Sequence, residues 1–471
     1  MGTCATAGRS WDFTFGNQLR LEKAGFDGFF AVPRGRLMTE SEQSGAPSFT
    51  EALKTWARIG VMSFGGPAGQ IALMHKVLVD EKKWLEERTY LLALNFCTLL
   101  PGPEAMQLAT YAGWRLHGVK GGLAAGLLFV IPGALVILAL SALYAQWGAV
   151  PAVSAVFLGI KAAVLAIVVE ALLRISKRSL KDSVEWGIAG AAFFAIFFLK
   201  VPFPLIVLGA ALIGWWRGSR PGAVTPTPAV AAVPVPVLQT LRTIAIWLAV
   251  WIVPLLAVAL AFGFDSVLAK LAWFFSKLAI VTFGGAYAVL AYMAQDVVQQ
   301  YGWLTAGEML DGLGLAETTP GPLILVTEFV GFLAAYRHGG GEPFLMGLLG
   351  ALVVLWATFA PCFLWIFAGA PYIERIAGMP RLKSALSAIT EAVVGVVLNL
   401  SLWFALHVIF RAVPEVIWGP LRFSLPELTS IDWTAAVLAV AAAFMLFRLH
   451  AGIAVVLGAC GAAALALSVW S

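Results

Sequence analysis

The sequence predicts an all-α integral membrane protein with about 13 transmembrane helices, arranged as two six-span repeats in antiparallel orientation around one extra helix. The first observation behind this prediction is composition: 60% of the 471 residues are apolar and 12% are charged, whereas soluble domains approach a half and a quarter. The second is a recurrence of glycine, proline and tryptophan at identical spacing in the two halves. Helices are expected to break at the recurring Gly-Gly and Pro-Gly-Pro motifs, because proline and glycine interrupt the helical hydrogen bonds.

The repeat is defined by residues that return 219 positions later in the chain. These pairs are Phe64-Gly65-Gly66 with Phe283-Gly284-Gly285, Trp84 with Trp303, and Pro101-Gly102-Pro103 with Pro320-Gly321-Pro322. Further along, Pro132 matches Pro361 at an offset of 229, and residues 337–342 account for the difference. A duplicated apolar chain with helix breaks at matching places is typical of transporters.

Apolar stretches near the length that crosses a bilayer follow one another along the chain. The first half has them at 52–77, 89–114, 119–146, 152–175, 184–199 and 202–216, and the second half at 271–295, 308–335, 344–370, 384–410, 432–448 and 451–470. The predicted domains are a polar, disordered extension (1–48), a first repeat (49–216), a Pro-rich linker (217–240), an extra helix (241–264) and a second repeat (265–471). One odd helix between two even-numbered units inverts the second unit relative to the first.

Basic residues favour a cytoplasmic N-terminus, because cytoplasmic loops collect Lys and Arg. That orientation places Arg115, Lys120, Arg174, Lys177, Arg178, Lys181, Arg217, Arg220, Arg242, Arg375, Arg381 and Lys383 inside. The mixed charges of residues 76–88 then lie outside, unless the Gly65-Gly66 segment is a re-entrant hairpin. The net charge of +5 is spread over loops, so it indicates membrane orientation and excludes a nucleic-acid-binding face.

The broken segments are the predicted anion-binding site. A half-helix that starts after a break presents unpaired N–H groups with positive dipole character, and bare glycine backbone lets an oxyanion approach closely. The candidate substrate-binding residues are Gly65, Gly66, Pro67, Gln70, Pro101, Gly102, Pro103, Gln107, Gly284, Gly285, Pro320, Gly321 and Pro322, together with the cations Lys161 and Arg58. Glu328 and Glu391 are candidates for coupling to protons or cations, because carboxylates at membrane depth are costly and often functional.

Each of these residues also has a plain structural interpretation. The breaks can simply kink helices for packing. Lys161 can extend to the interface, Arg58 can anchor the helix there, and Glu328 can be paired inside the bundle. The matched positions in both halves favour function at the breaks. For Arg58, anchoring at the interface is the favoured role.

With these motifs identified, the sequence resembles the chromate ion transporter family in its long, two-domain form. The resemblance rests on Ser63 to Pro67, Met74-His75-Lys76, Trp84, Leu100 to Pro103 with Gln107, and Gly159-Ile160-Lys161, then Thr282 to Gly285, Gly302-Trp303, Pro320 to Leu323 and Glu391 to Gly395. It implies a multi-pass carrier of the bacterial inner membrane that exports chromate and so gives chromate resistance. The second copy lacks a proline after Gly285 and a counterpart of Gln107, so roles do not transfer directly between the copies.

Other functions are left open by the residues. Sulfate has the charge and shape of chromate, so a sulfate or other oxyanion carrier, including proton-coupled uptake, is an alternative. An intramembrane transferase is a remote one: His75 and Asp80 have His-x4-Asp spacing. No nucleotide-binding phosphate loop and no metal-ligand spacing occur, so neither cofactor nor metal is expected. The expected partners are the oxyanion and the lipid bilayer, and a homodimer is compatible with the sequence.

Overall fold

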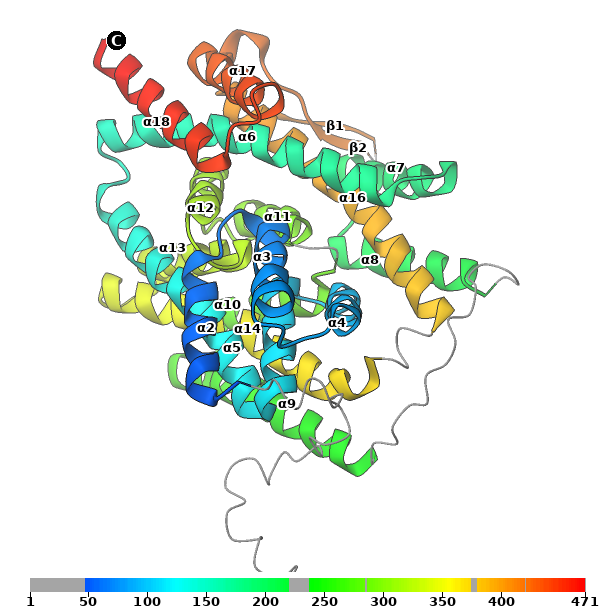
Figure 1. The fold of residues 1–471 in the computed structure, drawn as a ribbon. Coiled ribbons are helices and arrows are strands. Elements are labelled where there is room, and N and C mark those ends of the chain that lie inside the picture. Colours follow the sequence, from blue (N-terminus) through cyan, green and yellow to red (C-terminus); the bar gives the residue numbers. More distant parts are fainter. Residues whose placement is uncertain (1–46, 220–236, 284–285, 374–378, 420, 471) are drawn as a thin grey trace, which may run out of the picture.

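The computed structural model describes residues 47–219, 237–283, 286–373, 379–419 and 421–470. The first half contains α2 (Phe49–Met62), α3 (Gly66–His75), the π-helix η2 (Lys76–Glu81), α4 (Glu87–Leu99), α5 (Glu104–Trp147), α6 (Pro151–Ser179), α7 (Ser183–Phe198) and α8 (Phe203–Arg217). After α9 (Val237–Phe262), the second half contains α10 (Val267–Val281), α11 (Ala286–Gln295), the π-helix η3 (Asp296–Gln300), α12 (Ala306–Thr318), η4 (Leu323–Leu325), α13 (Val326–His338), α14 (Pro343–Gly369), η5 (Ala370–Tyr372) and α16 (Pro380–Ile409). The strands β1 (Glu415–Trp418) and β2 (Leu421–Ser424), η6 (Leu428–Ser430), α17 (Trp433–Phe447) and α18 (Ile453–Trp470) follow (Figure 1).

The structure confirms an all-α membrane protein. Five stretches are long and apolar enough to cross a bilayer: Glu104–Trp147, Pro151–Ser179, Val237–Phe262, Pro343–Tyr372 and Pro380–Ile409. Shorter apolar helices include α7, α8 and α17. The antiparallel hairpin of β1 and β2 lies between α16 and α17, in a connection for which the sequence predicted no regular structure. Most of the predicted 1–48 extension and 217–240 linker falls outside the described residues.

Four of the predicted apolar stretches are each divided into two helices. They are 52–77 (α2 and α3), 89–114 (α4 and α5), 271–295 (α10 and α11) and 308–335 (α12 and α13). The physical reason is the Gly and Pro motif inside each stretch, which ends one helix before the next begins. The predicted breaks are therefore confirmed at these four places, and the count of about 13 transmembrane helices stays a prediction.

The order of elements from α2 to α6 recurs from α10 to α16, with α13 and α14 in the place of α5, whose backbone is non-helical at His117 and Gly118. In both halves a ten-residue helix runs into a short π-helix. A buried tryptophan then fixes the turn: the N–H of Trp84 donates to Leu78 O over 2.8 Å, and the N–H of Trp303 donates to Val297 O over 3.0 Å. The recurrence of tryptophan in the sequence thus corresponds to the same local turn.

The two halves interlock through their long helices. α6 and α16 pack against each other, and each also receives the final helix pair of the opposite half. Thus α17 and α18 pack on α6, while α7 and α8 pack on α16, as the upper and right-hand parts of Figure 1 show. Glycines permit this closeness: a Cβ on Gly159 would lie 2.1 Å from Cys460 O, and one on Gly214 would lie 2.3 Å from Ser384 O.

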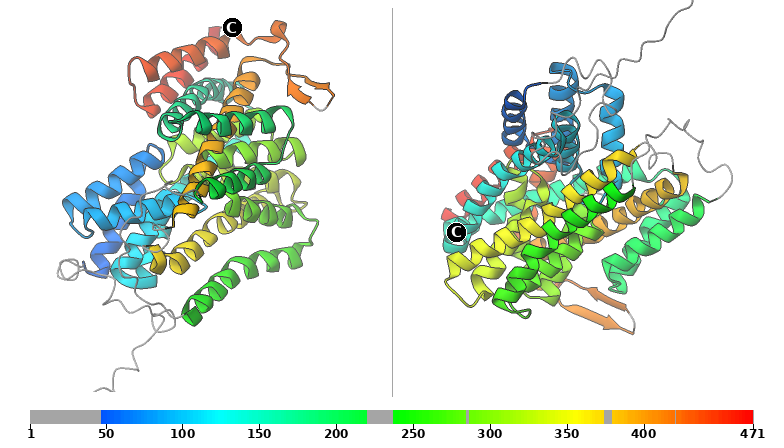
Figure 2. Two further views of the ribbon diagram at one scale, coloured as in Figure 1. Left: turned by 90° about the vertical axis from the view of Figure 1, so that its right-hand side faces the viewer. Right: turned by 90° about the horizontal axis from the view of Figure 1, so that it is seen from below.

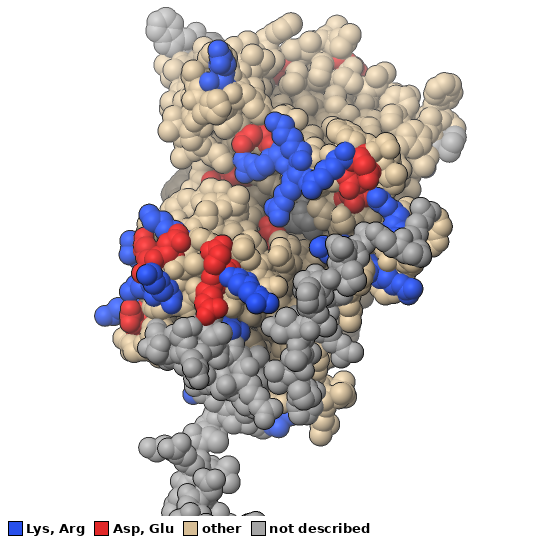
Figure 3. Space-filling view, turned by 45° about the vertical axis from the view of Figure 1, so that its right-hand side comes forward, with Lys and Arg blue, Asp and Glu red and all other residues tan. Residues whose placement is uncertain are grey.

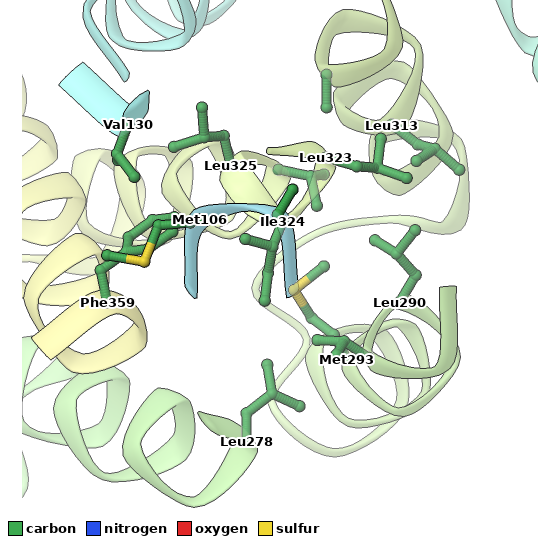
Figure 4. Packing of buried hydrophobic residues seen from close by; sticks show 14 of the residues in the cluster. Met106, Val130, Leu278, Leu290, Met293, Leu313, Leu323, Ile324, Leu325 and Phe359 are labelled. Atoms are coloured by element: carbon green, nitrogen blue, oxygen red, sulfur yellow. The ribbon is translucent and has the colours of Figure 1, made fainter. Parts of the chain in front are cut away.

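The remaining long helices cover the other side of the molecule. α9 packs against α10 and α14, and these helices run beside one another in Figure 2. The apolar core continues up to the Pro-Gly-Pro break of the second half. There η4 supplies Leu323, Ile324 and Leu325, which Figure 4 shows among Met106, Val130, Leu313 and other buried side chains. The Pro-Gly-Pro break of the second half is therefore followed directly by residues of a packed core.

Candidate functional site: two crossings of broken helices

The first Gly-Gly break separates α2 from α3. Gly65 and Gly66 have φ of +84° and +71°, values that favour glycine. A Cβ on either residue would meet no heavy atom within 4 Å, so this backbone borders open space. Pro67 lies in the first turn of α3, where its missing N–H costs nothing. In the second half, Gly284 and Gly285 lie outside the described residues.

The two Pro-Gly-Pro breaks share one backbone geometry. Gly102 has φ of +113° and Gly321 has φ of +91°. Pro103 and Pro322 immediately precede the next helix, because proline suits a helix start and cannot continue the helix before it. The sequence motif thus dictates the local conformation in both copies.

Each Pro-Gly-Pro break is hydrogen-bonded to the Gly-Gly break of the opposite half. The N–H of Gly102 donates to Thr282 O over 2.9 Å, and the N–H of Gly321 donates to Ser63 O over 2.8 Å. Thr282 and Ser63 are themselves equivalent, and each hydroxyl donates back to the carbonyl four residues earlier, of Leu278 and Ile59 respectively. The four breaks therefore meet at two matching places that link the halves. We call them the first crossing, where Gly102 meets Thr282, and the second crossing, where Gly321 meets Ser63.

The long helices that carry Pro132 and Pro361 pack directly on these crossings. A Cβ on Gly133 would lie 2.1 Å from Pro320 O, so α5 approaches the second break as closely as backbone allows. The equivalent position on α14 is Cys362, whose Sγ would lie 3.0 Å from a Cβ on Gly102. The Pro-Gly-Pro break of each half thus packs against a long helix of the other half: the first break against α14 and the second break against α5.

Two buried glutamines reinforce the crossings in different ways. Gln70 Nε2 donates to Gly321 O over 2.6 Å, and Gln107 Nε2 donates to Pro101 O over 2.7 Å. Both side chains are at most 1% exposed, and both Oε1 atoms are buried without a partner. The structure therefore brings Gln70 and Gln107 to the breaks, each with one acceptor atom still available.

The predicted cations are placed away from this arrangement or are already paired. Lys161 on α6 forms an ion pair of 3.2 Å with Asp311 on α12, and Tyr144 Oη donates to the same carboxylate over 2.7 Å. Arg58 is exposed on α2, and it forms no ion pair with a carboxylate of the described residues. Asp311 was missed by the sequence reasoning, although an isolated carboxylate in an apolar segment is a usable signal.

The predicted coupling carboxylates differ in their surroundings. Glu391 is bound by Arg217 Nη1 at 3.3 Å and by the hydroxyl of Ser387 at 3.1 Å. Glu328 on α13 is 1% exposed, and its Oε2 has no hydrogen-bond partner. A third buried carboxylate, Glu317, accepts a hydrogen bond of 2.8 Å from Tyr287 and so links the end of α12 to the start of α11.

Charged groups outside the crossings are mostly solvent-facing. Lys and Arg gather beside a hollow on the face shown in Figure 3, with Asp and Glu among them.

His75, Asp80 and Glu87 lie together, with His75 Nε2 at 2.6 Å from Glu87 and Nδ1 at 3.4 Å from Asp80. The described ranges contain no group of three His, Cys, Asp or Glu that could hold a metal ion.

Comparison with known proteins covers both halves of the chain. The family model described as chromate transporter matches residues 50–215 and 269–465. A chromate transport protein of Cupriavidus metallidurans is 29% identical over 75% of this chain and 82% of its own, and one of Pseudomonas aeruginosa is 32% identical over 74% and 79%. An uncharacterized transporter of Methanocaldococcus jannaschii is 26% identical over 78% and 87%.

No solved structure matches this chain. The family model accounts for the regions on both sides of α9, including all four breaks that meet at the crossings. The chain belongs to the chromate transporter family.

Proposed function

We propose that this protein carries chromate out of the cell across the bacterial inner membrane, driven by the membrane potential or the proton-motive force, and thereby gives chromate resistance. The observation that supports this most is the pair of crossings in a chain whose relatives are named chromate transport proteins. Export suits a dianion physically. With a negative interior, each charge gains about 2.3 kcal/mol per 100 mV on leaving, so two charges gain about 4.6 kcal/mol.

The substrate is proposed to bind between the crossings and the open backbone of Gly65 and Gly66. α3 begins there, and its N-terminus offers unpaired N–H groups with about half a positive charge. A Cβ on either glycine would meet no heavy atom within 4 Å, so there is space for a ligand beside the backbone. A tetrahedral oxyanion needs short, convergent donors without bulky neighbours, and bare helix starts supply them. By the repeat, Gly284 and Gly285 are proposed to complete the site from the other half.

The buried glutamines are proposed to position the breaks for the anion. Gln70 links α3 to the carbonyl of Gly321, so movement of one break is felt by the other. Each glutamine also has one amide oxygen without a partner. A protonated oxyanion can donate to such an oxygen, whereas a fully ionised one can only accept.

The proposed orientation places the N-terminus and the basic turn between α6 and α7 in the cytoplasm. Arg217 at the end of α8 lies 3.7 Å from Asp182 at the start of α7. Arg381 near the start of α16 lies 6.0 Å from the ring centre of Trp215. Residues from three of the loops assigned to the inside therefore share one end of the molecule, in agreement with the positive-inside rule.

A proton-coupled uptake carrier for sulfate or another oxyanion is the second candidate. Glu328 favours it, because a buried carboxylate with an unpartnered oxygen is costly unless it binds a proton or cation. In that case Glu328, with Glu391, would exchange a proton during transport. Glu328→Gln would then abolish proton dependence, while export driven by potential alone would keep its dependence on voltage.

The direct test is accumulation of radiolabelled chromate in cells expressing the chain, compared with an empty vector. Export predicts lower accumulation that returns to the vector level with a protonophore. Excess sulfate tests whether the two anions share a site. If they do, sulfate should compete with chromate and remove the difference in chromate accumulation between the expressing cells and the vector. Raised accumulation would overturn export and favour the uptake carrier.

A further inference from the structure

The two halves contain the same pair of short helices in different environments. The first short-helix pair is α3, η2 and α4 (residues 66–99), and the second is α11, η3 and α12 (residues 286–318). In the second pair, α12 packs against α6, α16 and α18, and α11 packs against α16. In the first pair, α3 and α4 pack closely on α5 but on neither α6 nor α16, and they project to one side in Figure 2.

Burial follows this difference. Residues 309–317 of α12 are all buried. The equivalent helix α4 leaves Arg88, Leu91 and Asn95 exposed, with Leu91 at 45%. Because the α-helices of the two pairs have the same lengths, and each pair has a π-helix and a tryptophan turn, the difference lies in packing against the scaffold and not in local structure.

The contacts that seat the second pair on α6 are specific. The Cβ position of Gly314 lies 3.7 Å from the Cβ of Ile160. Asp311 forms its 3.2 Å ion pair with Lys161, one residue further along α6. These are contacts between halves, so each has a counterpart position under the repeat.

The repeat maps α12 onto α4 with an offset of 219 and α6 onto α16 with an offset of 229. Gly314 then corresponds to Asn95, and Ile160 corresponds to Ile389. Lys161 corresponds to Thr390, beside Glu391, and Gly307, whose Cβ would lie 3.2 Å from Lys161 Nζ, corresponds to Arg88. Seating the first pair in the same way would thus bring Asn95 to Ile389 and the cation of Arg88 to the carboxylate of Glu391.

We infer that the protein has a second, exchanged conformation in which the first short-helix pair seats on α16 as the second pair now seats on α6. The second pair is then released. Because the two short-helix pairs are copies of one unit, each pair can adopt the packing that the other pair has. The structure holds one pair seated and one pair released, so it shows both packings at once. Exchange opens the crossings alternately to the two sides of the membrane. This inference rests on the proposed transport function.

Cysteine cross-linking tests the exchange. In a background with Cys4, Cys97, Cys362 and Cys460 replaced by alanine, Gly314→Cys with Ile160→Cys reports the observed conformation. Its Cβ separation of 3.7 Å suits a disulfide, for which the mean is about 3.8 Å. Asn95→Cys with Ile389→Cys reports the exchanged conformation. Both pairs are expected to cross-link in membranes under mild oxidation. Each cross-link is expected to stop chromate transport until the disulfide is reduced and the reductant is washed out before chromate is added.

The matched control is Asn95→Cys with Leu398→Cys, nine residues further along α16, which is expected not to cross-link. Cross-linking of Gly314 with Ile160 but never of Asn95 with Ile389 would overturn the exchange. A single Asn95→Cys variant that retains the native cysteines gives a second measurement. Its maleimide labelling should slow when transport is energised, and an unchanged rate would also count against the exchange. Loss of transport in every reduced variant and in the unaltered chain would instead refute the proposed function.

Discussion

The N–H of Gly321 donates a hydrogen bond of 2.8 Å to the carbonyl oxygen of Ser63, across 258 residues of chain. Its counterpart joins Gly102 to Thr282 at 2.9 Å. Neither bond can form within one half, so neither crossing exists without both copies. Backbone groups freed by proline and glycine need partners inside a membrane, and here each copy supplies them to the other.

Leucine at Gly102 or at Gly321 is expected to abolish transport while the protein still reaches the membrane. Both positions have positive φ, which costs a side chain roughly 1–3 kcal/mol of strain. A Cβ on Gly102 would also lie 2.9 Å from Gln107 Nε2. Chromate uptake by inverted vesicles, with the protein quantified by immunoblot, measures this. Gly190→Leu is the control, because a Cβ there meets nothing within 4 Å; normal transport by both variants would reject a role for the breaks.

Gln70→Leu is expected to lower both stability and transport. It leaves the buried carbonyl of Gly321 without the 2.6 Å hydrogen bond, a loss of about 1–3 kcal/mol. Thermal unfolding in detergent gives the stability, and vesicle uptake gives the rate. The exposed Gln300→Leu should leave both unchanged; equal effects of the two changes would contradict the coupling of α3 to the second break.

Lys161→Met is expected to destabilise the protein by up to about 3–5 kcal/mol, because Asp311 would keep a buried charge without its partner. The double variant Lys161→Met with Asp311→Leu removes both charges and should recover much of that loss. Unfolding in detergent measures the cycle. Lys82→Met is the control, since its exposed pair with Glu51 contributes only about 0–1 kcal/mol.

Transport by the same double variant separates two roles of Lys161. If the lysine serves as half of a link between α6 and α12, removing both charges should retain chromate transport. Loss of transport in a stably folded double variant would instead support direct binding of the anion by Lys161.

Asp432→Ala is expected to lower stability by about 1 kcal/mol at neutral pH, because its carboxylate caps α17. Burial alone would raise the pKa of Asp432, but the N–H of Ala435 and the guanidinium of Arg411 outweigh burial and lower the pKa below its ordinary value. This stabilisation is present above the unfolded-state pKa of about 3.9 and is lost as pH falls through the lower folded value. The variant should therefore unfold more easily than the parent at neutral pH, and the unfolding curves of the two proteins should coincide in acid.

Local features of this protein were predictable from the sequence because single residues dictate them. Glycine and proline set the four helix breaks, and Lys200 with Pro202 marks the turn between α7 and α8. Recurrence of the motifs predicted that helices break at matching places in the two halves. The positive φ values of Gly65, Gly66, Gly102 and Gly321 follow from residue type alone.

The sequence by itself therefore determined the membrane class, the duplication and the places where helices end. Only the tertiary structure decided that Gly321 bonds to Ser63, that Lys161 meets Asp311 and that Arg217 meets Glu391. The physical reason is that apolar helices offer many faces of equal hydrophobicity, so composition and periodicity specify burial without specifying the partner. The choice among partners depends on close backbone contacts at residues such as Gly133 and Gly314, which form only when distant segments pack together.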